Sequence, residues 1–249
     1  MTQELLPLTR IPRTGLPAHA LVVGDPARAE AVAGLLEDAK EVSHHREFRL
    51  FTGSRQGLPV AVASHGVGAP GAVLLFRELA DAGVRTLIRL GTAGAIRPGT
   101  ADGDLVIAEA AIRDDGVTGQ LLPPEYPAVS TPEAVLALQR AARDAGVPHH
   151  RGVVWTRAAF QPGLIPFTDY GKAGVVAIEM ELSALLVTAS LRGLTAGGVL
   201  VVDGANADEL VDAQATGGYN PHRRVVADGI GRAATVALEA LRLLAADGR

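Results

Sequence analysis

Small and charged residues follow the apolar run Ala20–Val23, in a pattern that could bind a small anion. Gly24 lets the backbone approach a ligand, and Asp25 can cap a helix that begins at the next residue. Free amides at such a helix start, together with Arg28 about one turn later, suit a phosphate group. A capped strand–helix turn without a ligand is the alternative interpretation.

Arg89 interrupts an apolar strand just before Gly91-Thr92-Ala93-Gly94, which we predict to be a glycine-flanked turn. Burying an unpaired charge is unfavourable, so Arg89 must meet either a bound anion or a neighbouring carboxylate. Thr92 would offer its hydroxyl and its backbone amide to the same ligand. The sequence leaves both partners of Arg89 open.

Glu179 and Glu181 flank Met180 where a short strand is predicted to enter a helix over 180–192. Side chains two residues apart on a helix point in different directions, so we do not expect an acid–base pair. One carboxylate could accept hydrogen bonds from two sugar hydroxyls. An acidic residue that stabilises the start of a helix is the alternative.

The segment Gly66–Gly71 matches the Gly-x-Gly-x-x-Gly pattern of dinucleotide-binding turns, after a predicted strand and before a predicted helix. That pattern needs an acidic residue about 20 residues later to bind the ribose. Arg89 stands there instead and could accept the phosphate of NADP. An NADP-dependent oxidoreductase is therefore an alternative function.

Other polar residues allow simpler interpretations. Asp203 ends the predicted strand 195–202 and is either catalytic or a cap of the turn that follows. Adjacent histidines, as in His44-His45 and His149-His150, cannot easily direct both rings at one metal ion in extended chain. The sequence therefore predicts no metal site.

The elements that must position these residues alternate along the chain. Strand-like runs are predicted at 20–23, 58–64, 84–90, 105–112, 152–156, 175–178 and 195–202, and helices at 26–36, 70–82, 132–145, 180–192 and 221–246. Strands apolar on both faces, alternating with helices, predict an α/β fold around a parallel or mixed sheet. Ligands of such folds bind beyond the carboxyl ends of the strands. No repeat or low-complexity linker divides the chain, so we predict one domain over residues 1–249.

Composition excludes several classes of function. With 23 basic and 27 acidic residues the net charge is −4, which argues against a nucleic-acid-binding face. The absence of cysteine excludes disulfides, thiolate metal ligands and cysteine nucleophiles. No apolar stretch reaches the roughly 18 residues of a membrane span or resembles a signal peptide, so a cytoplasmic protein without a membrane partner is expected. The 29 glycines against 4% aromatic residues indicate small packed side chains and close backbone approaches.

In their order along the chain, these motifs resemble the nucleoside phosphorylase superfamily, in particular its uridine phosphorylase branch. The resemblance runs from about Leu21 to Leu244, and the stretch from Asp115 to Val129 is more similar to uridine-preferring members. Its marks are Gly24-Asp25-Pro26 with Arg28, His45-Arg46-Glu47-Phe48, the Arg89–Gly94 segment and Glu179-Met180-Glu181. The family implies a single-domain three-layer α/β/α sandwich around a mixed, partly barrel-like sheet, assembled as a homo-oligomer, either a hexamer or a dimer.

The resemblance also implies a pentosyltransferase activity: phosphate cleaves the N-glycosidic bond of a nucleoside, giving free base and pentose 1-phosphate. Phosphate is the co-substrate, and no cofactor or metal is needed. The implied phosphate ligands are Gly24, Arg28, Arg89 and Thr92, with Arg46 reaching the site from a neighbouring subunit. The implied nucleoside-binding residues are Thr92, Ala93, Gly94, Phe160, Gln161, Glu179, Met180 and Glu181, and the implied catalytic residues are Arg89, Glu181 and Asp203.

Two departures from the family pattern concern the base. Leu164 and Pro166 stand where uridine phosphorylases carry a Gln and an Arg that read the uracil edge. Purine-preferring members carry an acidic or amide residue after the late strand; a count without gaps puts Gly204 there, so Asp203 takes that place only if the register shifts. A purine nucleoside phosphorylase, a nucleosidase of the same superfamily and a non-catalytic nucleoside or sugar-phosphate binder are the further alternatives.

Overall fold

The structure is a computed structural model that describes residues 4–159, 167–204 and 220–248. Its strands are β1 (His19–Val23), β2 (Glu37–His45), β3 (Phe48–Arg55), β4 (Leu58–Ser64), β5 (Thr86–Ala95), β6 (Leu105–Asp114), β7 (Ala128–Val129), β8 (His149–Arg157), β9 (Ala177–Glu179) and β10 (Thr195–Gly204). Its helices are α1 (Pro26–Ala33), α2 (Ala69–Asp81), α3 (Pro132–Asp144), α4 (Phe167–Lys172), α5 (Leu182–Arg192) and α7 (Arg224–Ala246), with a short 3-10 helix at Thr118–Gln120.

The strands form one mixed sheet, part of which closes on itself. Its order is β10-β6-β8-β9-β5-β1-β4-β3-β2, and β10 also pairs with β5. The strands β10, β6, β8, β9 and β5 therefore make a closed ring, from which β1, β4, β3 and β2 continue as an open sheet. The pairs β1–β4, β1–β5 and β10–β5 are parallel, while β2–β3 and β3–β4 are antiparallel. The predicted mixed, partly barrel-like sheet is confirmed.

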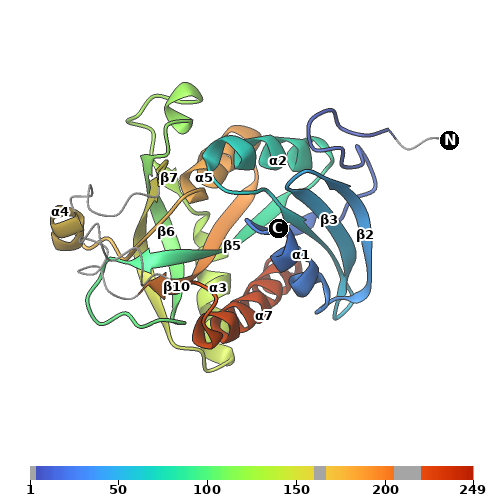
Figure 1. The fold of residues 1–249 in the computed structure, drawn as a ribbon. Coiled ribbons are helices and arrows are strands. Elements are labelled where there is room, and N and C mark those ends of the chain that lie inside the picture. The colour runs from blue at the N-terminus through green and yellow to red at the C-terminus, as the bar shows by residue number, and fades with distance from the viewer. Residues whose placement is uncertain (1–3, 160–166, 205–219, 249) are drawn as a thin grey trace.

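Helices cover both faces of this sheet (Figure 1). On one face α2 and α5 bury leucines, alanines and valines against the sheet, and on the other α1, α3 and α7 do the same. The long helix α7 buries Ala233, Ala237, Leu241 and Leu244, a three- and four-residue spacing that places one apolar stripe on the sheet. The predicted three-layer sandwich is confirmed, whereas a single domain over residues 1–249 stays a prediction.

The strand β2 had no signal in the sequence. The helix predicted over 26–36 ends at Ala33, and the polar segment Glu37–His45 then forms β2 at the edge of the sheet. Most of its residues are exposed, so no alternation of apolar and polar residues indicates a strand. Pairing with β3 decides its conformation. The two strands meet at a tight turn in which Arg46 has a φ of 55°.

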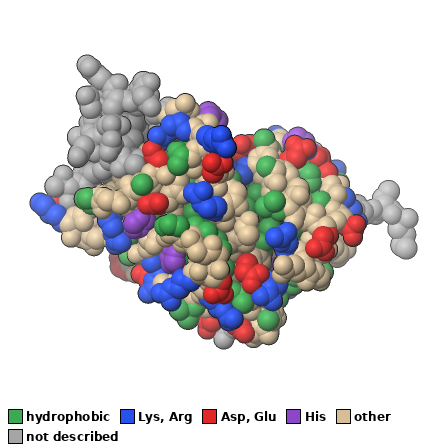
Figure 2. Space-filling model, turned by 90° about the horizontal axis from the view of Figure 1, so that it is seen from below, with side chains coloured by type: hydrophobic (Ala, Val, Ile, Leu, Met, Phe, Trp, Pro, Cys, Tyr) green, Lys and Arg blue, Asp and Glu red, His purple; other side chains and the backbone are tan. Residues whose placement is uncertain are grey.

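Charge is distributed without a dominant sign on the face shown in Figure 2, where basic and acidic side chains are interspersed. This agrees with the small net charge of the chain. Within the described ranges, no helix is long and apolar enough to cross a membrane.

Candidate active site

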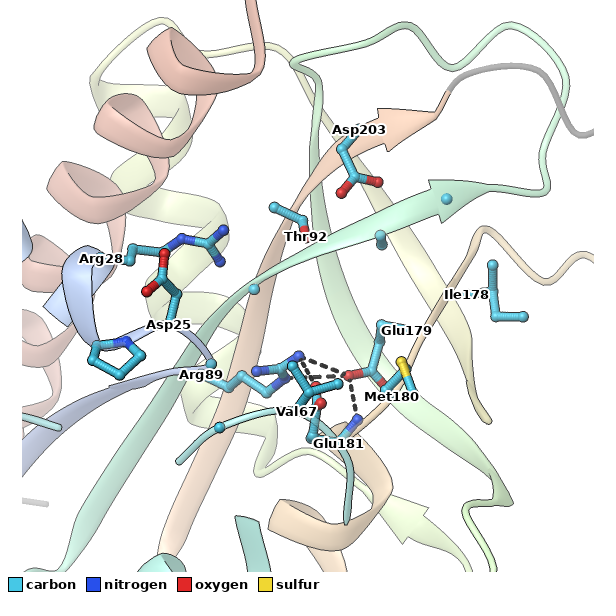
Figure 3. A pocket seen from close by; sticks show the side chains of 16 residues that line it. Asp25, Arg28, Val67, Arg89, Thr92, Ile178, Glu179, Met180, Glu181 and Asp203 are labelled. Atoms are coloured by element: carbon cyan, nitrogen blue, oxygen red, sulfur yellow. Dashed lines mark hydrogen bonds and ion pairs between the residues drawn. The ribbon is translucent and has the colours of Figure 1, made fainter. Parts of the chain in front are cut away.

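A cavity of about 630 Å³ lies where β1, β5 and β10 end. These strands are parallel, with Val23 beside Leu90 and Val201 beside Thr92, so their carboxyl ends lie at the same edge of the sheet. Several residues predicted from the sequence line this cavity: Gly24, Arg28, Arg89, Thr92, Ala93, Gly94, Glu179, Met180, Glu181 and Asp203. Arg28 and Asp203 lie on one side of β5, and Arg89, Glu179 and Glu181 on the other (Figure 3).

The start of α1 forms the first wall of the cavity. Asp25 is the N-cap, and its Oδ1 accepts a hydrogen bond from the amide of Ala27 at 2.8 Å, as predicted. Arg28 is half-buried and makes no hydrogen bond or ion pair with another described residue. Burial and the charge of Arg89 lower the pKa of Arg28, while Asp25 and Asp203 oppose this shift. An anion in the cavity would complete the surroundings of this guanidinium.

The predicted turn at Gly91–Gly94 is wrong: β5 continues through it to Ala95. The strand β10 pairs with this segment from one side, and β9 pairs with Gly94 and Ala95. Pairing on both sides overrides the preference of glycine for turns. Gly91 leaves room for the Arg89 side chain, because a Cβ at position 91 would lie 2.8 Å from Arg89 Nη2.

Arg89 is 3% exposed and ion-paired with both candidate carboxylates. Its Nη2 lies 3.1 Å from Glu179 Oε2 and also donates to Glu181 Oε2, while its Nε donates to Glu179 Oε2 at 3.2 Å. Its Nη1 lies 3.0 Å from His65 Nε2. Of the two partners left open by the sequence, the neighbouring carboxylate is therefore present, and it lies at the cavity wall.

The expectation that Glu179 and Glu181 diverge is wrong because neither lies within a helix. Glu179 ends β9, Glu181 occupies the N-cap position, and α5 begins at Leu182. Non-helical backbone at these positions turns both carboxylates toward Arg89. Glu179 also accepts hydrogen bonds from the amides of Glu181 and Leu182, and from the Thr156 hydroxyl. It thus fixes the start of α5 as well as Arg89.

Glu181 is 5% exposed, and it reaches a second segment of the site. Its Oε1 accepts a hydrogen bond from the amide of Gly68 at 2.5 Å. Burial raises the pKa of Glu181, and the charge of Arg89 offsets part of that shift. The amide of Gly68 belongs to the Gly66–Gly71 turn, which does join β4 to α2. A protein carboxylate thus occupies the helix start where a dinucleotide would place its pyrophosphate.

Asp203 reaches the cavity through an irregularity in β10. Val202 pairs with Ala93 and Gly204 with Gly94, so Asp203 is an extra residue, as in a β-bulge. Asp203 is 3% exposed and lines the cavity, and its backbone carbonyl accepts a hydrogen bond from Arg223.

Three predicted residues are not among those that the structure places at the cavity. Arg46 is exposed in the β2–β3 turn, and it does not line the cavity of its own chain. Phe160 and Gln161 lie outside the described residues, as do Leu164 and Pro166. No group of three or more described His, Asp or Glu side chains is arranged to hold a metal ion.

His65 was missed by the sequence analysis. It follows β4 directly and is completely buried next to Arg89. A lone histidine between a strand and a glycine-rich turn gives no signal by itself, because its importance comes from a residue 24 positions away.

Comparisons with known proteins show the family and the fold of the chain. A family model described as Phosphorylase superfamily matches residues 18–242. The chain belongs to this superfamily. A uridine phosphorylase of Thermococcus kodakarensis is 39% identical over 198 residues, which cover 74% of this chain and 72% of that protein.

Solved structures of two such enzymes share the fold over nearly the whole chain. A purine nucleoside phosphorylase of Toxoplasma gondii superimposes with a TM-score of 0.89 and 32% identity, covering 98% of each chain. A uridine phosphorylase of Vibrio fischeri superimposes with a TM-score of 0.86 and 25% identity, covering 98% of this chain and 99% of the other. These relatives are nucleoside phosphorylases, and this chain shares their fold over nearly its whole length.

Proposed function

We propose that this phosphorylase binds inorganic phosphate between Arg28 and Arg89, and the pentose of a nucleoside at Met180 and Glu181. The observation that carries the proposal is the meeting of two guanidinium groups and a carboxylate pair at one cavity. Thr92 lies on β5, the strand that also carries Arg89, and it lines the same cavity and supplies a hydroxyl. Phosphate is the co-substrate, and no further cofactor is proposed.

The reaction that suits this site is displacement at the anomeric carbon. As the N-glycosidic bond breaks, its electron pair moves to the base and positive charge develops on the sugar. A phosphate dianion held by Arg28 and Arg89 stabilises that charge, and one of its oxygens then forms the new bond to the anomeric carbon. Glu181 accepts hydrogen bonds from the 2′- and 3′-hydroxyls and fixes the ring. No nucleophilic side chain takes part.

The ion pair between Arg89 and Glu181 suits this division of roles. Phosphate would take over the Nη2 group of Arg89 that now donates to Glu181. The carboxylate released in this way would accept the sugar hydroxyls. Binding of the two substrates would then be coupled through one side chain.

Uridine is the leading substrate. The uridine phosphorylase of T. kodakarensis supports it, as does the Asp115–Val129 segment that resembles uridine-preferring members. A purine nucleoside is the second candidate, which Asp203 favours. A buried carboxyl group that lines the cavity can, when protonated, donate a hydrogen bond to a purine ring nitrogen. The T. gondii relative is a purine nucleoside phosphorylase.

Measuring the release of free base tests both the use of phosphate and the choice of nucleoside. The protein is incubated with uridine, thymidine, inosine and adenosine, each with and without phosphate. We expect phosphate-dependent release, fastest from uridine. Release that does not need phosphate would indicate a nucleosidase, and no release from any substrate would indicate a non-catalytic binder. Saturable binding of NADP, followed by fluorescence, would revive the oxidoreductase.

The matched variant Asp203→Asn separates the two bases. It keeps the size of the side chain but removes its charge. If the enzyme acts on purines, the variant should lose inosine cleavage while any uridine cleavage persists.

We further propose a cytoplasmic homo-oligomer, a hexamer or a dimer, in which Arg46 completes the phosphate site of a neighbouring subunit. The exposure of Arg46 supports this, since it is left outside the cavity of its own chain. Mixing the variants Arg46→Ala and Arg89→Ala should restore activity in hybrid oligomers. No recovery of activity in verified hybrids would exclude a shared site.

A further inference from the structure

We propose that His65 is a positioning residue that holds the guanidinium of Arg89 in the orientation that binds phosphate. The inference rests on the proposed role of Arg89. His65 is 0% exposed, and it is not one of the described residues that line the cavity. It lies behind Arg89, with its ring edge-on to Phe76 at a centroid distance of 5.4 Å. Its effect on substrate must therefore pass through Arg89.

The partners of the His65 ring determine where its proton lies. Nδ1 is 2.8 Å from the carbonyl oxygen of Gly66, which can only accept a hydrogen bond, so Nδ1 carries the proton. Nε2 is 3.0 Å from Nη1 of Arg89, which can only donate, so Nε2 presents its lone pair. Both contacts require the same neutral tautomer. Burial and the nearby charges of Arg89 and Arg28 lower the pKa of His65, which keeps the ring neutral.

A neutral acceptor has an advantage that a carboxylate lacks at this place. Glu179 and Glu181 bind the Nε and Nη2 side of the guanidinium and offset its charge. His65 satisfies the Nη1 side without adding a third negative charge, which would repel an anion that replaces Glu181 at Nη2. Without His65, Nη1 would lose a buried partner, and Arg89 would gain freedom to turn away from the cavity.

The backbone of His65 links this contact to the other side of the phosphate site. Its amide donates to the carbonyl of Val23 at 2.9 Å, and the amide of Gly66 donates to the carbonyl of Gly24 at 2.9 Å. His65 is thereby held beside the end of β1, which is the segment proposed to approach phosphate. His65 thus contacts Arg89 through its ring, and its backbone and that of Gly66 bind the segment at Val23 and Gly24.

The test compares two substitutions. His65→Leu removes both ring nitrogens and keeps an apolar side chain against Phe76. His65→Gln keeps a carbonyl oxygen that can accept from Arg89. We expect His65→Leu to raise the KM for phosphate about tenfold with little change in the KM for nucleoside, and His65→Gln to recover most of the loss. Circular dichroism and the Tm confirm that each variant folds. A wild-type KM for phosphate in a folded His65→Leu variant would overturn the inference.

Arg89→Ala and the double variant separate this inference from the function on which it rests. If His65 acts through Arg89, adding His65→Leu to Arg89→Ala raises the KM for phosphate no further. Fully additive effects would overturn the inference and leave the phosphate site intact. If Arg89→Ala alone leaves the use of phosphate unchanged, the proposed phosphate site fails instead.

Discussion

Two buried charged clusters in this protein are built in opposite ways. On α2, Glu78 is 4% exposed, and its carboxylate accepts hydrogen bonds from the amides of Leu8 and Thr9 and from the Thr9 hydroxyl, at 2.6 to 3.0 Å. All three donors are neutral and belong to the N-terminal segment. At the cavity, Arg89 is shared by two carboxylates and a neutral histidine.

The difference shows how burial of charge serves stability in one place and binding in the other. The donors of Glu78 are supplied by the chain itself, and Glu78 does not border the described cavity. It fastens the N-terminal segment to α2. Arg89 and Glu181 do border the cavity, so a bound ligand can take the place of either residue as the partner of the other. Substitutions at the cavity should therefore affect mainly activity, and substitution of Glu78 should affect mainly stability.

Arg89→Ala should have the largest effect on activity. Removing a group that stabilises charge in the transition state typically reduces the rate by about 10²- to 10³-fold, and we expect a loss near the upper value in kcat/KM for phosphate. Expressed as a free energy, the loss of stability should be smaller than the loss of activity. The carboxylates left behind border the cavity, and Glu181 can take up a proton. Phosphate saturation curves and urea denaturation check this prediction. An unchanged phosphate dependence would remove Arg89 from the site.

Glu78→Ala should show the reverse pattern. Three buried donors lose their acceptor, and the free energy of unfolding should fall by about 2 to 3 kcal/mol. Activity per folded molecule should stay near that of the wild type. Glu78→Gln, which keeps one acceptor oxygen, serves as the matched control and should lose less. If Glu78→Ala keeps its stability but loses activity, the contrast between the two clusters is wrong.

Glu181→Gln should have the smallest effect on stability, with a sign that depends on pH. Because burial raises the pKa of Glu181 above its ordinary value of 4.5, the folded protein binds more protons than the unfolded chain above that pH. Stability of the wild type relative to the variant should therefore fall as the pH rises from about 4.5 through the raised pKa. Denaturation of both proteins across this range measures the difference. A constant difference would show that Glu181 does not titrate differently on folding.

Activity offers a second measure of the same group. Only the ionised carboxylate accepts hydrogen bonds from both hydroxyls, so kcat/KM should fall as the pH is lowered. Because the pKa of Glu181 is raised, this fall should begin at a higher pH than for an ordinary carboxyl group. Glu181→Gln should lack this acid limb and be less active at neutral pH. A retained acid limb would assign it to another group.

The sequence was most informative where local patterns and tertiary structure agree. Helix α1 begins at Pro26 with Asp25 as its cap because a short carboxylate and a proline favour that geometry in any context. The apolar strand runs predict the layers, since burial on both faces requires helices above and below. The edge strand β2 was not predicted, because its mostly exposed residues show no alternation of apolar and polar side chains.

The sequence by itself determined which chemical groups stand near the ends of the strands: Arg28 after β1, Arg89 within β5, Glu179 at the end of β9, Glu181 just after it, and Asp203 near the end of β10. Only the tertiary structure decided how they meet. Strand pairing straightened the Gly91–Gly94 segment, the late start of α5 turned two carboxylates to one guanidinium, and a bulge brought Asp203 to the cavity. The physical reason is that these outcomes depend on hydrogen bonds and ion pairs between segments far apart in the chain, which local residue preferences do not specify.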